Sequence, residues 1–187
     1  NEILAFADGA CAGNPGKGGW AALLIFASGR ILEIGGADPQ TTNNRMELQA
    51  AIEVLKLTQS LSAPVRLCID SKYVMLGAQE WIKGWKLNGW KSSKKEDVKN
   101  KDLWLELDQQ LQSRKAPIHW QHVPGHSGIA GNEIVDEIAV AFSTGAPPKL
   151  FDGDRSEYRA SFDELQEFSI GERFAAPVYL SLFDGKL

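Results

Sequence analysis

The alternation of apolar and polar positions along the chain predicts a mixed α/β domain. Five apolar runs are short enough to be strands: residues 1–8, 20–27, 31–35, 65–70 and 118–123. Four segments read as helical: residues 42–60, 71–88, 100–113 and 130–142. A Gly/Pro-rich stretch, residues 9–19, reads as a loop, and Ser28-Gly29-Arg30 is typical of a hairpin turn. This order predicts a five-stranded mixed sheet flanked by helices.

Four acidic residues stand where a carboxylate is costly. Asp8 and Asp70 end apolar runs, while Glu47 and Asp136 lie on, or at the margin of, apolar helix faces. A carboxylate next to a packed core is destabilising unless a positive charge neutralises it. Open α/β sheets place their sites beyond the ends of strands, and the helices packed over them can reach the same end. The sequence therefore predicts that these carboxylates meet around bound metal.

The ligand type narrows the choice of metal. Carboxylate oxygens without paired His or Cys favour Mg²⁺ or Mn²⁺ over zinc. Several carboxylates that share one or two such ions are the arrangement used for phosphoryl transfer. The alternative is that these are unrelated surface acids among the 24 Asp and Glu of the chain. For any one acid alone this alternative is the commoner case, but the adjacency of all of them to apolar structure favours a site.

Charge is unevenly distributed. The net charge is −4, yet residues 83–101 hold seven lysines against Glu96 and Asp97. A concentrated basic patch on an acidic protein attracts polyanions.

The short apolar runs and the two cysteines predict a cytoplasmic protein with no membrane segment. The apolar runs are far shorter than the roughly 20 residues that span a bilayer, and the N-terminus carries no leader-like stretch. Cys11 and Cys68 do not form a metal-binding spacing, and a chain of this size needs no disulfide framework, so a reducing compartment fits.

Several sequence blocks resemble type 1 ribonuclease H of the bacterial kind. They are residues 8–16, 42–48, 70–74, 81–91 and 125–128, together with Asn132, Glu133 and Asp136. The blocks follow one another in the family's order over about residues 3–143, which is far more specific than any single motif. The resemblance implies a ribonuclease H-like fold.

The resemblance also implies an activity. The family hydrolyses the RNA strand of RNA–DNA hybrids as an endonuclease and leaves 5′-phosphate and 3′-hydroxyl ends. Asp8, Glu47, Asp70 and Asp136 would bind two Mg²⁺ ions, with Mn²⁺ as a substitute. One ion would activate the attacking water and the other would stabilise the leaving 3′-oxygen. His126 would assist proton movement or product departure.

The family pattern further implies contacts with each strand of the hybrid. The backbone at Cys11 and the side chains of Asn14 and Asn43 would meet the RNA strand, while Thr42 and Asn100 would hold a DNA-strand phosphate. Lys72 stands where the bacterial pattern often has Gln, so its RNA contact would be electrostatic. The basic segment would bind the hybrid through Trp81, Trp85, Lys86, Lys91, Lys94 and Lys95.

Tryptophans in the basic segment have a second interpretation. Trp81, Trp90 and Trp104 can instead fix the protruding helix to the body of the domain. We expect substrate contact for Trp85 and core packing for Trp90 and Trp104.

Two other classes of function compete with a nuclease acting on hybrids. One is a non-catalytic nucleic-acid binding module with the same fold, which the four retained acids and His126 disfavour. The other is a related integrase or exonuclease, which the collinear motifs and the tryptophan-rich basic segment disfavour. We expect a monomeric enzyme whose partner is the RNA–DNA hybrid.

Pro147-Pro148 ends the family pattern. We therefore expect a catalytic domain at residues 1–145 and an extension or linker at residues 146–187. Residues 178–185 resemble the opening strand of a small hybrid-binding module, so the natural chain is expected to continue into one. The alternative is an acidic linker that partly packs on the nuclease.

Overall fold

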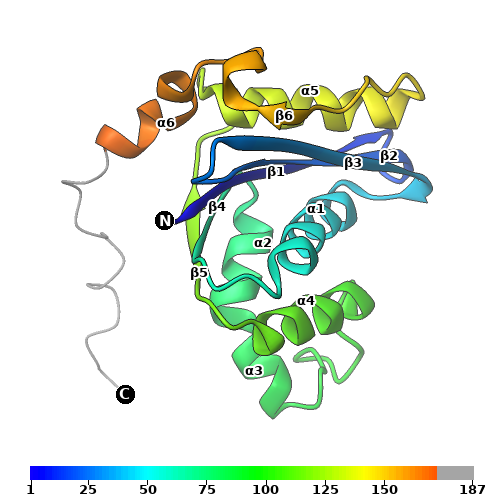
Figure 1. Ribbon diagram of the computed structural model, residues 1–187. Coiled ribbons are helices and arrows are strands. Elements are labelled where there is room, and N and C mark those ends of the chain that lie inside the picture. Colours follow the sequence, from blue (N-terminus) through cyan, green and yellow to red (C-terminus); the bar gives the residue numbers. More distant parts are fainter. Residues whose placement is uncertain (172–187) are drawn as a thin grey trace.

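The computed structural model describes residues 1–171, which form one sheet with helices on both faces (Figure 1). The strands are β1 (Ile3–Ala12), β2 (Gly16–Ile25), β3 (Arg30–Thr41), β4 (Val65–Ile69), β5 (Ile118–His122) and β6 (Asp152–Asp154). The helices are α1 (Asn43–Thr58), α2 (Lys72–Leu76), the π-helical turn Gly77–Trp81, α3 (Ile82–Leu87), α4 (Lys101–Ser113), α5 (Ala130–Thr144), the 3₁₀ turn Arg155–Glu157 and α6 (Phe162–Gly171).

The strand order in the sheet is β5-β4-β1-β2-β3-β6. β1 runs parallel to β4, and β4 runs parallel to β5, whereas the β1–β2, β2–β3 and β3–β6 pairs are antiparallel. The predicted mixed α/β class is confirmed. The predicted number of five strands is corrected to six, because a short strand from the C-terminal extension pairs with β3.

Alternate residues of β1 divide the interior into two cores. Ile3, Ala5 and Ala7 face the core that α1 and α4 cover, whereas Leu4 and Phe6 face the core under α5. Figure 1 shows α1 and α4 on one side of the sheet and α5 on the other. A strand covered on both faces reads as a continuous apolar run, which is why residues 3–7 show no polar alternation.

The Gly-rich stretch expected as a loop is mostly strand, with a turn at residues 13–15. β1 and β2 continue through it as a paired ribbon, from Gly9 opposite Trp20 to Ala12 opposite Lys17. The glycines permit close helix packing rather than a loop. A Cβ on Gly19, for example, would stand 2.1 Å from the Ala139 carbonyl of α5.

The C-terminal extension packs on the domain as far as the structure describes its side chains. β6 continues the sheet beside β3, and Leu165 of α6 is fully buried in the core under α5. Glu33 of β3 is a buried carboxylate, and it accepts hydrogen bonds from the Phe151 amide (2.9 Å) and the Tyr158 hydroxyl (2.7 Å). The strand expected at residues 178–185 lies outside the described residues.

No helix in residues 1–171 combines the length and apolar character needed to cross a bilayer.

Candidate active site

The register of two parallel strands brings the first pair of acids together. Phe6 of β1 is paired with Cys68 of β4, so Asp8 and Asp70, two positions further along each strand, come to lie side by side. Asp70 directly follows β4, as predicted, but Asp8 lies within β1, opposite Ala21 of β2, rather than at its end. Asp8 is therefore 6% exposed.

Helix α1 adds the third carboxylate. Thr42 caps the helix by accepting from the Arg45 amide, and Glu47 follows within the first turns. Gly9 allows α1 to approach β1, because a Cβ at this position would stand 2.3 Å from the Glu47 nitrogen. The Ser71 hydroxyl donates to Glu47 Oε2 and accepts from the Val74 amide, so Ser71 both orients the carboxylate and caps α2.

These three carboxylates form one cluster of uncompensated negative charge. An oxygen of Asp8, of Glu47 and of Asp70 all lie within 4.8 Å of one another. Burial, with the charge of Asp70 next, raises the pKa of Asp8 to about 8, although the Gly9 amide donates to its Oδ1 at 2.7 Å. Burial, with the same charge, raises the pKa of Glu47 to about 7 against the hydrogen bond from Ser71.

The cluster fits a hard divalent cation. Among the ion pairs of the described residues, none involves Asp8, Glu47 or Asp70, so no protein cation neutralises them. Their donors are carboxylate oxygens alone, which suit Mg²⁺ or Mn²⁺. The raised pKa values of Asp8 and Glu47 mark sites where a cation would displace protons.

Helix α5 places Asp136 at the margin of the cluster. Its charge contributes to the raised pKa of Asp8, so the two carboxylates are close. Asp136 is half-buried and is not one of the three acids within 4.8 Å of one another. Its role as the fourth ligand stays a prediction.

Asn132 lies one turn earlier in α5. It is among the residues that resemble the family, but the sequence predicts no role for it. It is 2% exposed, and its Nδ2 lies 3.5 Å from Asp70 Oδ2. Together with Ser71, it shows that the cluster is held by neutral side chains from neighbouring elements. The sequence signal that pointed to it is its place among the residues that resemble the family, one helical turn before Asp136.

His126 lies in the exposed loop between β5 and α5. The loop passes the cluster, because a Cβ on Gly125 would stand 2.9 Å from Asp70 Oδ2. His126 itself has a left-handed backbone with φ 51°. Next to it, the Ser127 hydroxyl donates to the Pro124 carbonyl, and the Gly128 amide donates to Glu133.

The residues expected to meet the RNA strand lie around the β1–β2 turn and the start of α1. The Asn43 amide donates to Asn14 Oδ1 at 3.2 Å, so the structure brings these two together. Cys11 is half-buried at the end of β1, and its thiol donates to the Gly13 carbonyl at 2.6 Å. Lys72 is exposed at the first position of α2.

Tryptophans of the basic segment form a cluster of tilted and edge-to-face rings. The Trp85 ring lies 5.9 Å from that of Trp81, 6.1 Å from that of Trp90 and 5.3 Å from that of Trp104. Trp104 is fully buried and Trp90 is partly buried against the same core, as predicted for both. Trp81 is 36% exposed. Trp85 packs against three other tryptophan rings, so its contact with substrate stays a prediction.

The expected lysines of this segment are exposed. Lys86 pairs with Asp108 at 3.2 Å and Lys91 with Asp97 at 2.6 Å, so part of their charge is already compensated. Lys94 and Lys95 lie on the exposed turn between Lys91 and Asp97.

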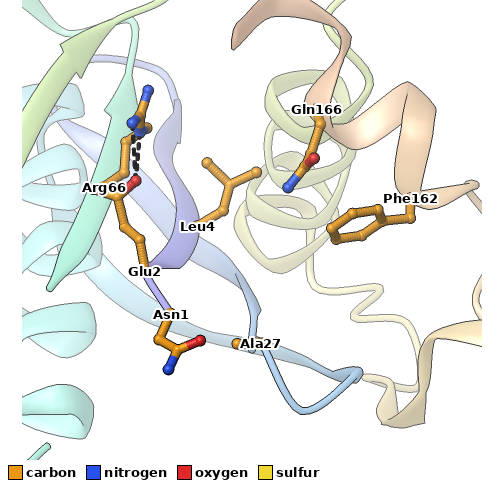
Figure 2. A pocket seen from close by; sticks show the side chains of 7 residues that line it. All are labelled: Asn1, Glu2, Leu4, Ala27, Arg66, Phe162 and Gln166. Atoms are coloured by element: carbon orange, nitrogen blue, oxygen red, sulfur yellow. Dashed lines mark hydrogen bonds and ion pairs between the residues drawn. The ribbon is translucent and has the colours of Figure 1, made fainter. Parts of the chain in front are cut away.

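A hollow of about 500 Å³ lies elsewhere, near the start of β1 (Figure 2). It is lined by Asn1, Glu2, Leu4, Ala27, Arg66, Phe162 and Gln166. The ion pair between Glu2 and Arg66 occupies one wall, and α6 forms another. It contains none of the predicted site residues.

The raised pKa values predict how the metal-free protein responds to pH. The folded pKa of Asp8 lies above its ordinary 3.8 and that of Glu47 above 4.5. Between roughly pH 4 and pH 8 the folded state therefore binds more protons than the unfolded state, and the free energy of unfolding falls as pH rises. We expect Asp8→Asn to stabilise the protein in EDTA by on the order of 2 kcal/mol at pH 8 and by much less at pH 5.

Thermal melts in EDTA at both pH values measure this effect. Glu80→Gln, which neutralises an exposed carboxylate, serves as the control and should change neither melting temperature. Adding Mg²⁺ at pH 8 should then stabilise the wild type more than Asp8→Asn. If Asp8→Asn stabilised the metal-free protein equally at pH 5 and pH 8, the destabilisation could not be assigned to the charge of Asp8.

Comparisons with known proteins agree with this architecture. The sequence profile of the family described as RNase H matches residues 1–144. Ribonuclease H of Cyanothece sp. is 51% identical over 146 residues, which cover 78% of this chain and 91% of that protein. Ribonuclease HI of Pseudomonas aeruginosa is 49% identical over 138 residues, which cover 74% and 90% respectively.

Solved structures show the same fold. LC9-RNase H1 is described as a type 1 RNase H with the type 2 active-site motif. It superposes with a TM-score of 0.72 at 29% identity, and the match covers 87% of this chain and 82% of LC9-RNase H1. The foamy viral protease-reverse transcriptase in complex with RNA/DNA hybrid shares the fold alone, with a TM-score of 0.66 at 21% identity over 76% of this chain and 20% of its own. With the profile and two relatives near 50% identity in agreement, the chain belongs to the ribonuclease H family of nucleases.

Proposed function

We propose that this enzyme cuts the RNA strand of RNA–DNA hybrids internally and leaves 5′-phosphate and 3′-hydroxyl ends. One observation carries the proposal: oxygens of Asp8, Glu47 and Asp70 lie within 4.8 Å of one another without a protein cation, on a family fold whose curated relatives are ribonucleases H. Such a cluster can bind the metal that phosphodiester hydrolysis needs.

Asp8, Glu47, Asp70 and Asp136 would hold two Mg²⁺ ions, with Mn²⁺ as a substitute. The bound ions would supply activation of the attacking water and stabilisation of the leaving 3′-oxygen. Ser71 orients Glu47, and Asn132 approaches Asp70, so the chain itself fixes the directions of the ligand oxygens.

His126 is the residue we assign to proton movement or product departure. It is exposed on the loop beside Asp70, and an imidazole can both accept and donate a proton. Its Gly-flanked loop gives the side chain access to groups that arrive with the substrate.

The hybrid would lie across the carboxylate cluster and the basic segment. We propose that Cys11, Asn14 and Asn43 meet the RNA strand, whose 2′-hydroxyls distinguish it from DNA. Thr42 and Asn100 would hold a DNA-strand phosphate. The remaining expected contacts are Lys72, Trp81, Trp85, Lys86, Lys91, Lys94 and Lys95, where aromatic rings would pack on sugars and lysines would meet phosphates.

We further propose that the enzyme acts as a monomer in the cytoplasm. Cys11 and Cys68 are not joined by a disulfide, which fits a reducing compartment.

A hybrid with a 5′-labelled RNA strand tests the proposal. We expect internal cuts in the RNA strand with Mg²⁺ or Mn²⁺ and none in EDTA, and no cuts in the DNA strand or in double-stranded RNA. The products should be substrates for ligation at the 5′-phosphate and for primer extension at the 3′-hydroxyl. Absence of cleavage with both metals, or cleavage of the DNA strand, would overturn the proposal.

A further inference from the structure

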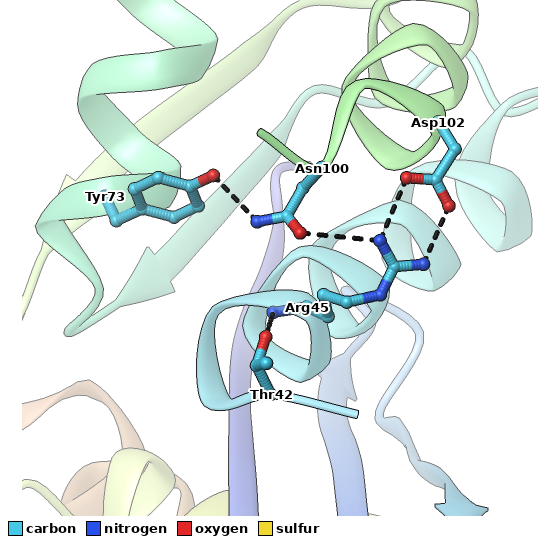
Figure 3. A network of polar contacts seen from close by, with 5 residues as sticks. All are labelled: Thr42, Arg45, Tyr73, Asn100 and Asp102. Atoms are coloured by element: carbon cyan, nitrogen blue, oxygen red, sulfur yellow. Dashed lines mark hydrogen bonds and ion pairs between the residues drawn. The ribbon is translucent and has the colours of Figure 1, made fainter. Parts of the chain in front are cut away.

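A network of polar side chains links α1 to the start of α4 (Figure 3). Arg45 of α1 donates to both carboxylate oxygens of Asp102, at 2.9 and 2.7 Å. The same guanidinium donates from Nη1 to Asn100 Oδ1 at 3.4 Å. Asn100 Nδ2 donates to the Tyr73 hydroxyl at 3.0 Å, so both ends of its carboxamide are engaged.

Arg45 decides which way the Asn100 carboxamide faces. A guanidinium can only donate, so the atom next to it must be the amide oxygen. The Tyr73 hydroxyl can donate or accept and would tolerate either atom, although it also accepts from Trp104 Nε1 at 3.1 Å. A rotated amide would place its N–H group against Arg45 and its oxygen on the other side.

The orientation of the Asn100 carboxamide decides whether a donor or an acceptor faces the negatively charged phosphate. In the observed orientation, one N–H of Asn100 bonds to Tyr73 and the second is available to an acceptor. The Thr42 hydroxyl already accepts from the Arg45 amide, so its own hydrogen is available too. Two such donors suit a phosphate oxygen, whereas a rotated Asn100 would present an oxygen that repels it.

Arg45 is itself held in place. Its bidentate ion pair with Asp102 fixes the guanidinium plane and raises the pKa of Arg45. Asn100 has a left-handed backbone with φ 58° at the N-terminus of α4, so its Cα position depends on how α4 is anchored. Asp102 lies two residues further along and supplies that anchor.

We infer that Arg45, clamped by Asp102, is a positioning residue that keeps the Asn100 carboxamide with its N–H toward the DNA-strand phosphate. The inference rests on the proposed function, which places that phosphate beside Thr42 and Asn100. Arg45 acts through Asn100 and does not itself contact the substrate.

Steady-state cleavage of the hybrid by the Arg45→Met variant of residues 1–187 tests this role. We expect KM to rise about 5- to 20-fold with kcat within about twofold of the wild type, as for the loss of a binding contact away from the reacting atoms. The matched control is Lys56→Met, which removes another α1–α4 ion pair, with Glu106, and should leave both constants unchanged. Arg45→Lys, which retains a donor and the charge, should recover part of the affinity.

A double-mutant cycle separates positioning from general stability. On an Asn100→Ala background, Arg45→Met should raise KM no further, because there is no carboxamide left to orient. The slope of log affinity against log salt should also be unchanged by Arg45→Met. A slope reduced by about one would show a direct phosphate contact by Arg45 and overturn the inference.

Asp102→Ala provides a second variant, at a position whose side chain is 64% exposed. It frees the guanidinium and should raise KM in the same direction but less. If the wild type cleaves hybrids and Asn100→Ala raises KM while Arg45→Met does not, this inference fails alone. If the wild type does not cleave hybrids, it is the proposed function that fails.

Discussion

We expect Asp70→Asn to lower kcat on an RNA–DNA hybrid by on the order of a thousand-fold or more, while the hybrid still binds. Asp70 is the carboxylate whose charge raises the pKa of both Asp8 and Glu47, so it stands at the centre of the cluster. An amide has nearly the same shape but carries no charge and one fewer acceptor oxygen. The substitution therefore weakens cation binding without removing the surface that meets the hybrid.

Single-turnover cleavage and hybrid binding in Ca²⁺ measure the two parts of this expectation. Glu53→Gln is the control, since it neutralises an acid of α1 that lies outside the cluster and pairs with Lys56. Calorimetric titration should show weaker Mg²⁺ binding to Asp70→Asn than to Glu53→Gln. Undiminished cleavage by Asp70→Asn would remove the cluster from the mechanism.

The position of the carboxylates was predictable because their neighbours in sequence carry the signal. An acid that follows an apolar run meets the sheet edge, and this logic placed Asp70 correctly. It misplaced Asp8 within its strand, because the glycines at 9–19 resemble a loop. Residues 9–12 and 16–19 pair as strands, and the absence of a side chain at Gly9 and Gly19 allows α1 and α5 to approach them.

The contacts that orient the cluster could not be predicted in the same way. Ser71 meets Glu47 across 24 positions, and Asn132 meets Asp70 across 62. No local pattern of apolar and polar residues encodes such pairs. The Arg45 network is of the same kind, since it exists only once α4 has packed on α1.

The sixth strand was missed because its sequence carries no strand signal. Asp152-Gly153-Asp154 has neither apolar alternation nor β-branched residues. It pairs with β3 because tertiary contacts hold it there. Arg30 binds Asp152 at 2.7 Å, and the Glu33 carboxylate accepts from the Phe151 amide on the adjoining residue.

Truncation to residues 1–145 is expected to destabilise the domain by on the order of 4 kcal/mol, because residues 146–165 cover part of its core. Leu165 is fully buried there, and the rings of Phe151 and Tyr158 pack edge to face at 5.0 Å. The cut also leaves Glu33 without its partners from the extension. Water would then solvate that carboxylate, so most of the loss comes from exposed apolar surface.

Chemical denaturation of the two chains measures this loss, and Tyr158→Phe in the full chain isolates the polar part. Burial and the Glu33 carboxylate raise the pKa of Tyr158, so its hydroxyl remains a donor at neutral pH. Its removal from a site that stays covered should cost about 1–3 kcal/mol. At low temperature the truncated chain should still cleave hybrids, because the carboxylate cluster lies within residues 1–145. Equal stability of the two chains would instead support the expectation of a linker from residue 146 onward, whereas the expected loss would show that the folded catalytic domain extends beyond residue 145.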